Sequence, residues 1–366
     1  MKFPTLAWAI AFSISLSTWA GTDPDTGVPT AQSKSVGMSS ERLDRLSAVM
    51  QSYIDDELLA GTVTLIARKG KVVHFEALGH RDLEADAPMT KDSIFVMMSM
   101  TKPIVSVALM MLYEEGHFLL DDPITKWIPE LEGKKVLNES DSGEPRATAD
   151  GPVTVRHVLT HTSGLDPART KLSDDERALM QRKETVELTL LQRATLPLNF
   201  QPGTRWQYGS STDYVALLVE RMSGMNMDEY LRERIFKPLG MNDTHYNVPE
   251  SKLDRVAAVY RPSKEDKTIE LAYPPTYREP TKYFPGTYGL SSTAADYFKF
   301  QQMVLNGGEL NGVRLLSPKT VNLMITNHIG DKSVYIRGPG YGFGLGYSVL
   351  LDPGTAIEPL TPGSFS

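Results

Sequence analysis

The sequence predicts an α/β fold of the α+β kind, in which helices pack against an antiparallel sheet. Two observations predict it. From Ser39 to Ile54 apolar residues recur at helical spacing, and two strand-like segments follow directly. A helix followed by a hairpin is typical of an antiparallel sheet with helices against it. Residues 95–116 are so apolar that they indicate a second helix, buried in a large core.

The composition of the chain excludes several classes of function. The 366 residues are 41% hydrophobic and 23% charged, as in an ordinary globular protein with one large domain or two interleaved ones. The net charge of -7, without a run of Lys or Arg, argues against nucleic acid or an anionic membrane as partner. The chain has no cysteine, which excludes disulfides, zinc-thiolate sites and thiol catalysis. We therefore expect a small-molecule substrate and no cofactor.

The N-terminal region has the layout of a secretory signal peptide. Residues 1–20 contain Lys2, an apolar run over 6–16 and small residues that end at Ala20. We expect cleavage after Ala20 and export to the periplasm or the medium, the alternative being a retained N-terminal anchor. Residues 21–38 are rich in Thr, Asp, Pro and Ser, so we expect a loosely ordered linker.

The sheet domain is predicted next. Ser39 can cap the helix that follows it, and residues 62–68 and 71–77 are predicted strands around a Lys69-Gly70 turn. We expect residues 39–85 to form a sheet domain together with residues 285–366. Residues 86–284 are expected to form a mainly helical domain.

The buried helix begins with the pattern Ser99-Met-Thr-Lys102. Positions i and i+3 share one face of a helix, so the lysine ammonium is expected beside the serine hydroxyl. Pro103 is tolerated only near a helix start, which places Ser99 at the N-terminus. Burial and the positive end of the helix dipole both disfavour a charged lysine, which could then act as a base toward the serine. A chance match to this short pattern is the alternative.

Several shorter elements follow. Residues 133–152 are polar and contain three residues that favour turns, so a surface insertion is predicted. Residues 153–165 predict a short helix capped by Thr154 and ended by Gly164. Its His157 and His161 are four apart, but without a third ligand at metal-binding spacing we interpret them as structural. Residues 174–196 and 214–222 are predicted helices.

Tyr208 is predicted to lie in a tight turn. It is the only tyrosine of the chain that is followed two residues later by Ser or Asn. A phenol beside a lysine could pass protons between a nucleophile and a leaving group. A packed aromatic ring is the alternative.

Six ordered segments carry a resemblance to a known superfamily: SMTK at 99–102, LDDPITKWIPE, VTVRHVLTHTSGL, FQPGTRWQYGSSTD, the YGS turn within it, and GLSSTAADYFKF. Over residues 39–366 the chain resembles the serine beta-lactamase-related superfamily, which includes class C beta-lactamases, DD-peptidases and family VIII carboxylesterases. The resemblance implies a beta-lactamase/transpeptidase-like fold. It also implies that Ser99 is acylated, Lys102 is its base and Tyr208 shuttles the proton.

The chain departs from this pattern in two places. Ser210 stands where class C enzymes have Asn, and a hydroxyl offers no amide N–H to a lactam side chain. Neither Lys-Thr-Gly nor Trp-Gly-Gly occurs, so we expect the third motif, its oxyanion strand and further strands beyond Ser366. In the aromatic region 273–288, Tyr283 and Phe284 are expected to line a substrate pocket with Ser210. Packing of the loop against the protein is the alternative for these aromatic residues.

These patterns predict a secreted serine hydrolase that cleaves small carboxylic esters through an acyl-enzyme. One alternative keeps the mechanism and takes a beta-lactam or a D-Ala-D-Ala peptide. A second alternative is a non-catalytic wall-binding or scaffold protein of the same fold. The absence of a GxSxG elbow disfavours an α/β-hydrolase esterase. Neither the oligomeric state nor the acyl and alcohol groups follow from the sequence.

Overall fold

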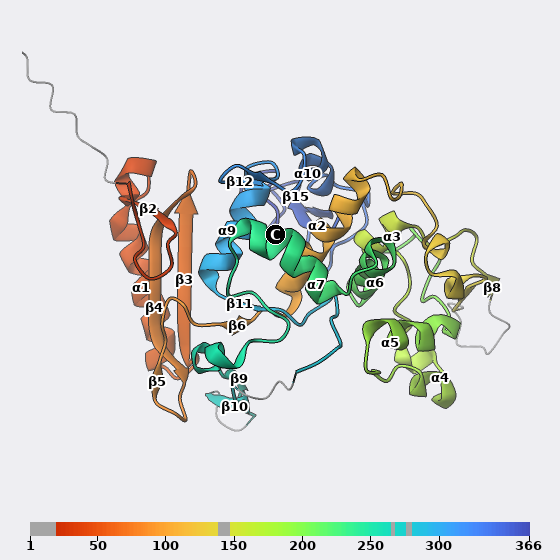
Figure 1. The fold of residues 1–366 in the computed structure, drawn as a ribbon, viewed down its shortest axis with the longest axis horizontal. Helices are drawn as coiled ribbons and strands as arrows, with labels where there is room; N and C mark the ends of the chain where they lie inside the picture. The colour runs from red at the N-terminus through yellow and green to blue at the C-terminus, as the bar shows by residue number, and fades with distance from the viewer. Residues whose placement is uncertain (1–19, 138–146, 265–267, 276–279) are drawn as a thin grey trace, which may run out of the picture.

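The computed structural model describes residues 20–137, 147–264, 268–275 and 280–366. Residues 1–19, which hold most of the predicted signal peptide, lie outside the described part. A sheet at one side and a larger, mainly helical part make up the molecule (Figure 1). This mixture of helices and antiparallel strands confirms the predicted α+β fold class. The ten α-helices of the described residues are α1 Ser40–Asp55, α2 Thr101–Glu114, α3 Val155–Leu159, α4 Asp174–Ala178, α5 Val186–Gln192, α6 Ser211–Ser223, α7 Met227–Leu231, α8 Lys237–Leu239, α9 Ala294–Leu305 and α10 Pro318–Met324.

The main sheet has the order β1-β2-β4-β3, and β5 pairs with β4. All its pairs are antiparallel except that of β2 with β4. Every other strand belongs to a two-stranded pair. The strands of the described residues are β1 Ala20–Thr22, β2 Pro29–Ala31, β3 Gly61–Arg68, β4 Lys71–Asp82, β5 Ala87–Pro88, β6 Phe95–Val96, β7 Lys135–Val136, β8 Ala147–Thr148, β9 Val259–Pro262, β10 Ile269–Tyr273, β11 Ser291–Ser292, β12 Glu309–Leu310, β13 Val313–Arg314, β14 Tyr341–Phe343 and β15 Ser348–Leu350.

The first helix and the hairpin form as predicted. The Ser39 hydroxyl accepts a hydrogen bond from Arg42 N at 3.3 Å and caps α1. Lys69 and Gly70 both have positive φ, at 54° and 71°, the geometry that a two-residue turn needs to match the twist of the strands. Helix α1 packs against β4, and α9 packs against β3. Residues of this hairpin therefore reach the C-terminal third of the chain.

The prediction of a loosely ordered linker over residues 21–38 is wrong. This segment forms β1, β2 and a 3-10 turn. Val28 is fully buried in a small apolar cluster with Val72 and Phe298, so the segment gains apolar burial that its composition does not reveal. Asp23 accepts a hydrogen bond from Lys91 Nζ at 2.8 Å, which ties the segment down further.

Two predicted helices are shorter than expected. Helix α3 ends at Leu159 rather than before Gly164, because His161 takes a positive φ of 57° and Thr162 N donates to the His157 carbonyl. The predicted helix over 174–196 is divided into α4 and α5, because Thr185 caps a new start. Of the predicted insertion over 133–152, the ends pair as β7 and β8, and residues 138–146 lie outside the described part.

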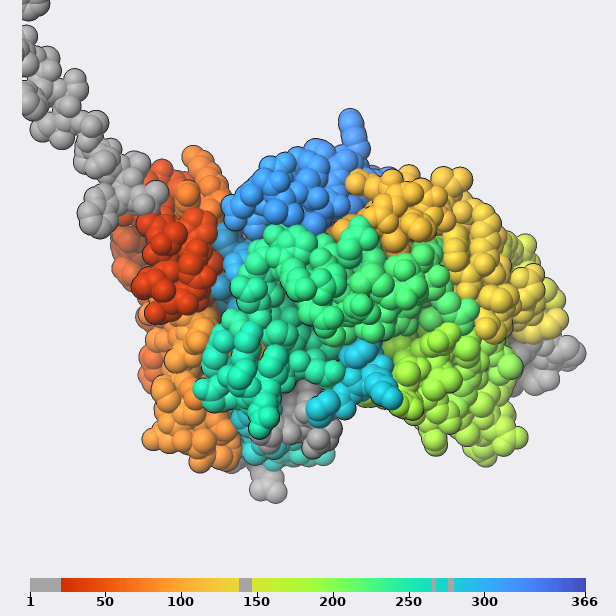
Figure 2. Space-filling model, in the orientation of Figure 1, coloured from red at the N-terminus to blue at the C-terminus, as the bar shows by residue number. Residues whose placement is uncertain are grey.

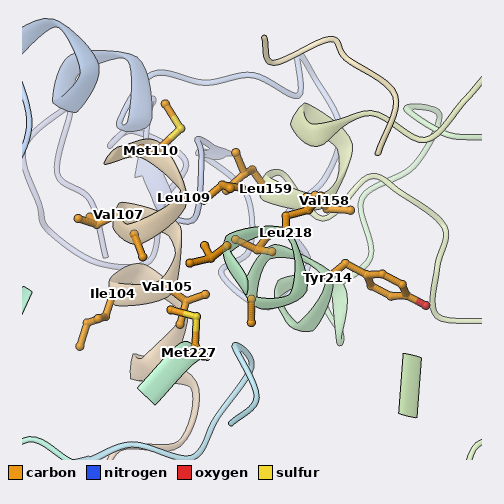
Figure 3. Packing of buried hydrophobic residues seen from close by; sticks show 14 of the residues in the cluster. Ile104, Val105, Val107, Leu109, Met110, Val158, Leu159, Tyr214, Leu218 and Met227 are labelled. Carbon is orange, nitrogen blue, oxygen red and sulfur yellow. The ribbon is translucent and has the colours of Figure 1, made fainter. Parts of the chain in front are cut away.

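Helix α2 occupies the centre of the core. All twelve residues from Thr101 to Leu112 are buried. Figure 3 shows the side chains of α2, among them Leu109, packing toward Leu218 of α6 and Leu159 of α3. The same cluster includes Met324 and Leu345 from the C-terminal region. The division into domains 39–85 with 285–366 and 86–284 stays a prediction. Among the described helices, none has the length and apolar character that crossing a bilayer demands.

Candidate active site

The serine and the lysine meet where β6 passes into α2. A 3-10 turn over Met98–Met100 joins the two elements, so Ser99 lies just before the helix and is exposed to solvent. Lys102, in the first turn of α2, is only 4% exposed. Its Nζ donates to Ser99 Oγ at 2.9 Å and to the carbonyl of Thr287 at 3.0 Å. A buried amine within hydrogen-bond distance of an exposed hydroxyl is the arrangement that activation of a serine requires.

The backbone at this turn is strained. Met98 has a φ of 47°, a conformation uncommon for a residue with a side chain. The segment before it is held by β6, which pairs with β11, and by Met97 N, which donates to the Leu290 carbonyl at 2.9 Å. These fixed neighbours maintain a sharp turn that presents Ser99 outward. The methionine gave no signal of this turn in the sequence.

Tyr208 lies beside the same lysine. Lys102 Nζ is 4.5 Å from the centroid of the Tyr208 ring, so the contact is a cation–π contact with the ring face. The backbone N–H of Tyr208 donates to the Tyr335 hydroxyl at 3.2 Å. The structure thus brings Ser99, Lys102 and Tyr208 together, with the phenol hydroxyl not bonded to the other two among the described residues.

An aromatic cluster fixes the Tyr208 ring. The centroid of the His161 ring lies 5.1 Å from that of Tyr208 and 5.4 Å from that of Phe343. The centroid of the Trp206 ring lies 6.1 Å from those of both His161 and Tyr208. Burial, with a smaller effect of the nearby Lys102, lowers the pKa of His161 to about 3. His161 is therefore neutral at physiological pH.

His157, the other histidine of the pair, stabilises the start of helix α3. His157 Nδ1 accepts a hydrogen bond from Thr154 N and completes a capping box at the start of α3. No cluster of three His, Asp or Glu side chains suited to a metal occurs in the part of the chain that the structure describes.

Two carboxylates flank the site, Asp213 buried and Asp166 half-buried, and sequence reasoning missed both. Asp213, 3% exposed, accepts a hydrogen bond from Thr287 N at 2.9 Å, and burial raises its pKa. Asp213 and Lys102 thus bind opposite ends of one residue, Thr287. The carboxylate of Asp166 accepts bonds from both the N–H, at 2.6 Å, and the hydroxyl of Ser210. An acid directly before a predicted helix, here that over 214–222, is ordinarily explained by the helix dipole, which concealed the role of Asp213.

The three predicted substrate-binding residues are placed differently. Ser210 follows Tyr208, but its hydroxyl is bonded to Asp166. Tyr283 lines a cavity of about 410 Å³ whose lining also includes Met98, the neighbour of Ser99. Phe284 packs against Tyr246, with ring centroids 5.2 Å apart, and borders a separate surface hollow. A substrate contact of any of the three stays a prediction.

Comparison with known proteins gives a consistent picture. The family model described as Beta-lactamase matches residues 46–365. Protein Rv1367c of Mycobacterium tuberculosis is 34% identical over 330 residues, which are 88% of this chain and 82% of the relative. Esterase EstB of Burkholderia gladioli is 30% identical, with coverage of 92% and 86%. The solved structure of EstCE1, a hydrolase with promiscuous acyltransferase activity, is similar with a TM-score of 0.73, 26% identity and coverage of 88% and 87%.

Proposed function

Because the chain belongs to the Beta-lactamase family of serine hydrolases and related acyltransferases, we propose that it is a carboxylesterase that cleaves small esters through an acyl-enzyme on Ser99. The observation that carries the proposal is the 2.9 Å contact between Ser99 Oγ and the buried Nζ of Lys102. The relative named as an esterase supports the choice among the reactions of the family.

Acylation starts with Lys102. In its neutral form the Lys102 amine has a lone pair and two N–H donors, and this is the form that can act as a base. One N–H donates to the Thr287 carbonyl, and the lone pair can then accept the proton of the Ser99 hydroxyl. The Ser99 oxygen attacks the ester carbonyl, the C–O bond to the alcohol breaks, and the alkoxide takes the proton through Lys102 and the Tyr208 hydroxyl.

Deacylation uses the same groups in reverse. Water gives its proton to the base, its oxygen attacks the acyl carbon, and the bond to Ser99 breaks with return of a proton to the serine. The products are one carboxylic acid and one alcohol, so the mass and charge of the reaction balance. Tyr208 can serve both steps because the cluster around His161 holds its ring in place.

The surroundings of Ser210 support an ester rather than a lactam. Its hydroxyl donates to the Asp166 carboxylate, so it is engaged within the protein rather than free for a substrate. The side chain also lacks an amide N–H for a lactam side-chain carbonyl. A beta-lactam or a D-Ala-D-Ala peptide is the second substrate class, because the family contains enzymes of that kind.

Labelling and turnover test this proposal together. A fluorophosphonate probe should label the protein on the peptide that contains Ser99, and Ser99→Ala should abolish the label. Ser52→Ala, which changes an exposed serine of α1, is the matched control and should label normally. p-Nitrophenyl acetate should be hydrolysed much faster than nitrocefin.

Three other results would change the proposed activity or the proposed nucleophile. Faster turnover of nitrocefin would replace the esterase by a lactamase with the same nucleophile. Labelling of a peptide without Ser99 would remove the assignment, and neither label nor turnover would favour a non-catalytic protein of this fold.

We also propose that the protein is exported, on the basis of the charged, apolar and small-residue order of residues 1–20. Expression with the native N-terminus, followed by cell fractionation and N-terminal sequencing, tests it. A chain that starts at Gly21 in the periplasm or medium is expected. A cytoplasmic chain with residues 1–20 intact would contradict export.

A further inference from the structure

A cavity beside Ser99 combines aromatic walls with an arginine side chain. Its lining includes Met98, the neighbour of Ser99, and also Tyr288 and Gly289, which follow the residue whose carbonyl binds Lys102. Its volume of about 410 Å³ is within the range of small-molecule sites. Tyr246 and Tyr283 contribute aromatic wall, and both are almost fully buried. The cavity is therefore positioned to receive part of a substrate attached to Ser99.

Arg182 is the only charged side chain among the described residues that line this cavity. Its guanidinium carbon lies 3.9 Å from the centroid of the Tyr283 ring, and its Nη2 donates to Thr281 Oγ1 at 3.3 Å. Stacking on the ring holds the planar group and leaves most of its N–H edge available. Thr281 is itself fixed by paired hydrogen bonds with Asn247.

The positive charge of Arg182 is not neutralised within the described part of the chain. No described carboxylate lies within ion-pair distance of it. The nearby Glu184 pairs instead with Lys282, at 3.1 Å. Figure 2 shows the segment near residue 282 on the surface beside the yellow-green segment that carries Arg182. An oriented guanidinium over an aromatic wall, without an ion-pair partner among the described residues, is suited to binding a carboxylate with two hydrogen bonds.

We propose that this cavity binds an ester substrate that carries a free carboxylate, with Arg182 as the residue that recognises the anion. The inference rests on the proposed hydrolase function and specifies its substrate class. The aromatic walls accommodate the apolar chain between the ester and the carboxylate, and Arg182 selects the charged end. A neutral ester of equal length would fill the same walls and offer the guanidinium no anionic group.

The main test compares two esters of equal acyl length, the mono-p-nitrophenyl ester of adipic acid and p-nitrophenyl hexanoate. Arg182→Gln should raise KM and lower kcat/KM for the anionic ester by about 10- to 100-fold, the scale of a lost charge-assisted hydrogen bond. Turnover of the hexanoate should change less than about twofold. Arg182→Lys should retain part of the preference, because it keeps the charge and loses the planar pair of donors.

Arg45→Gln is the matched control, because it removes the same charge from an exposed position on α1. It should leave both esters unaffected. 4-Acetoxybenzoate, with its carboxylate on the leaving group, shows which side of the ester enters the cavity: a dependence on Arg182 for this compound alone would assign the cavity to the alcohol.

The outcomes separate this inference from the proposed function. Hydrolysis of all esters with an equal ratio in wild type and Arg182→Gln would overturn the carboxylate site and leave the hydrolase intact. If no ester is cleaved, a measurement of ligand binding tests the carboxylate site instead. Monomethyl adipate should then raise the Tm of Ser99→Ala, and this rise should be lost when Arg182→Gln is added. Equal shifts with and without Arg182 would overturn the inference.

Discussion

At the residue scale, the site depends on a lysine that is almost completely removed from solvent and still polar in its contacts. Lys102 has one partner that is a hydroxyl, one that is a carbonyl, and the face of the Tyr208 ring. Lys102→Met keeps a side chain of similar length in the buried position, so the fold should survive. The loss of the base should lower kcat for p-nitrophenyl acetate by at least about a hundredfold.

The companion change Tyr208→Phe removes only a hydroxyl and keeps the packing against His161. We expect a similar loss of kcat, at least about a hundredfold, because protons would then lack a carrier. Steady-state kinetics measure both variants, and circular dichroism checks the fold. An unchanged kcat in Tyr208→Phe would show that the ring only packs.

Asp213 gives a second prediction at this scale, on stability. Burial raises the pKa of its carboxyl above the ordinary 3.8, so the folded state holds the proton more strongly than the unfolded chain. Stability from this group is present below pH 3.8 and is lost as the pH rises toward the raised value. Asp213→Asn keeps an acceptor for Thr287 N and removes the buried charge.

The Tm of Asp213→Asn minus the Tm of wild type should therefore be more positive at pH 7 than at pH 3. Thermal unfolding across this pH range measures it. The groups that face Asp213 include Asp166, which opposes its ionisation, and Lys102, which favours it. A Tm difference that does not vary with pH would contradict the assignment of the raised pKa to Asp213.

At the element scale, the loop 285–289 connects the cavity lined by Arg182 to Lys102, the proposed base. A Cβ on Gly286 would lie 2.1 Å from the Thr212 carbonyl oxygen, so the loop approaches α6 more closely than any side chain permits. Gly286→Ala should displace Thr287, whose carbonyl positions Lys102 and whose N–H binds Asp213. We expect a lower Tm and a loss of kcat of about tenfold or more.

Gly116→Ala serves as the comparison for that variant. Gly116 has a positive φ of 83° but nothing within contact distance of an added Cβ, and it lies at the far end of α2. It should lower stability through backbone strain and leave kcat close to wild type. If the two variants lose activity equally, the contact between loop 285–289 and Lys102 is not what the Gly286 change disturbs.

At the scale of the whole molecule, we expect the burial of histidines to lower the stability of the fold in acid. Burial lowers the pKa of four of the seven histidines below 6.5, and that of His161 falls to about 3; the four are His157, His161, His245 and His328. The unfolded chain binds these protons first, so stability should fall as the pH is lowered from about 6.5 toward 3.

His161→Asn isolates the largest of these contributions. Asparagine tolerates the positive φ of this position, and it does not titrate. Loss of packing should lower the Tm at every pH, whereas the decline of stability between pH 6.5 and 3 should become shallower. Urea unfolding at several pH values measures the slope. An identical slope in wild type and variant would mean that His161 is not the buried neutral group.

The sequence by itself determined the fold class, the hairpin and the pairing of Ser99 with Lys102. These depend on interactions between residues close in the chain: a Ser39 cap, a Lys69-Gly70 turn, and a three-residue spacing at the start of an apolar helix. Local chemistry is the same before and after folding, so patterns of a few residues reveal it.

Only the tertiary structure decided the rest. Residues 21–38 are ordered because Val28 finds Phe298, more than 200 residues later, and no local pattern contains that contact. The same is true of Asp213, Thr287 and Arg182, which come to the site from separate segments. A buried carboxylate, a carbonyl that orients a lysine and a guanidinium stacked on a tyrosine ring have their properties because of what surrounds them, and only the folded chain supplies those surroundings.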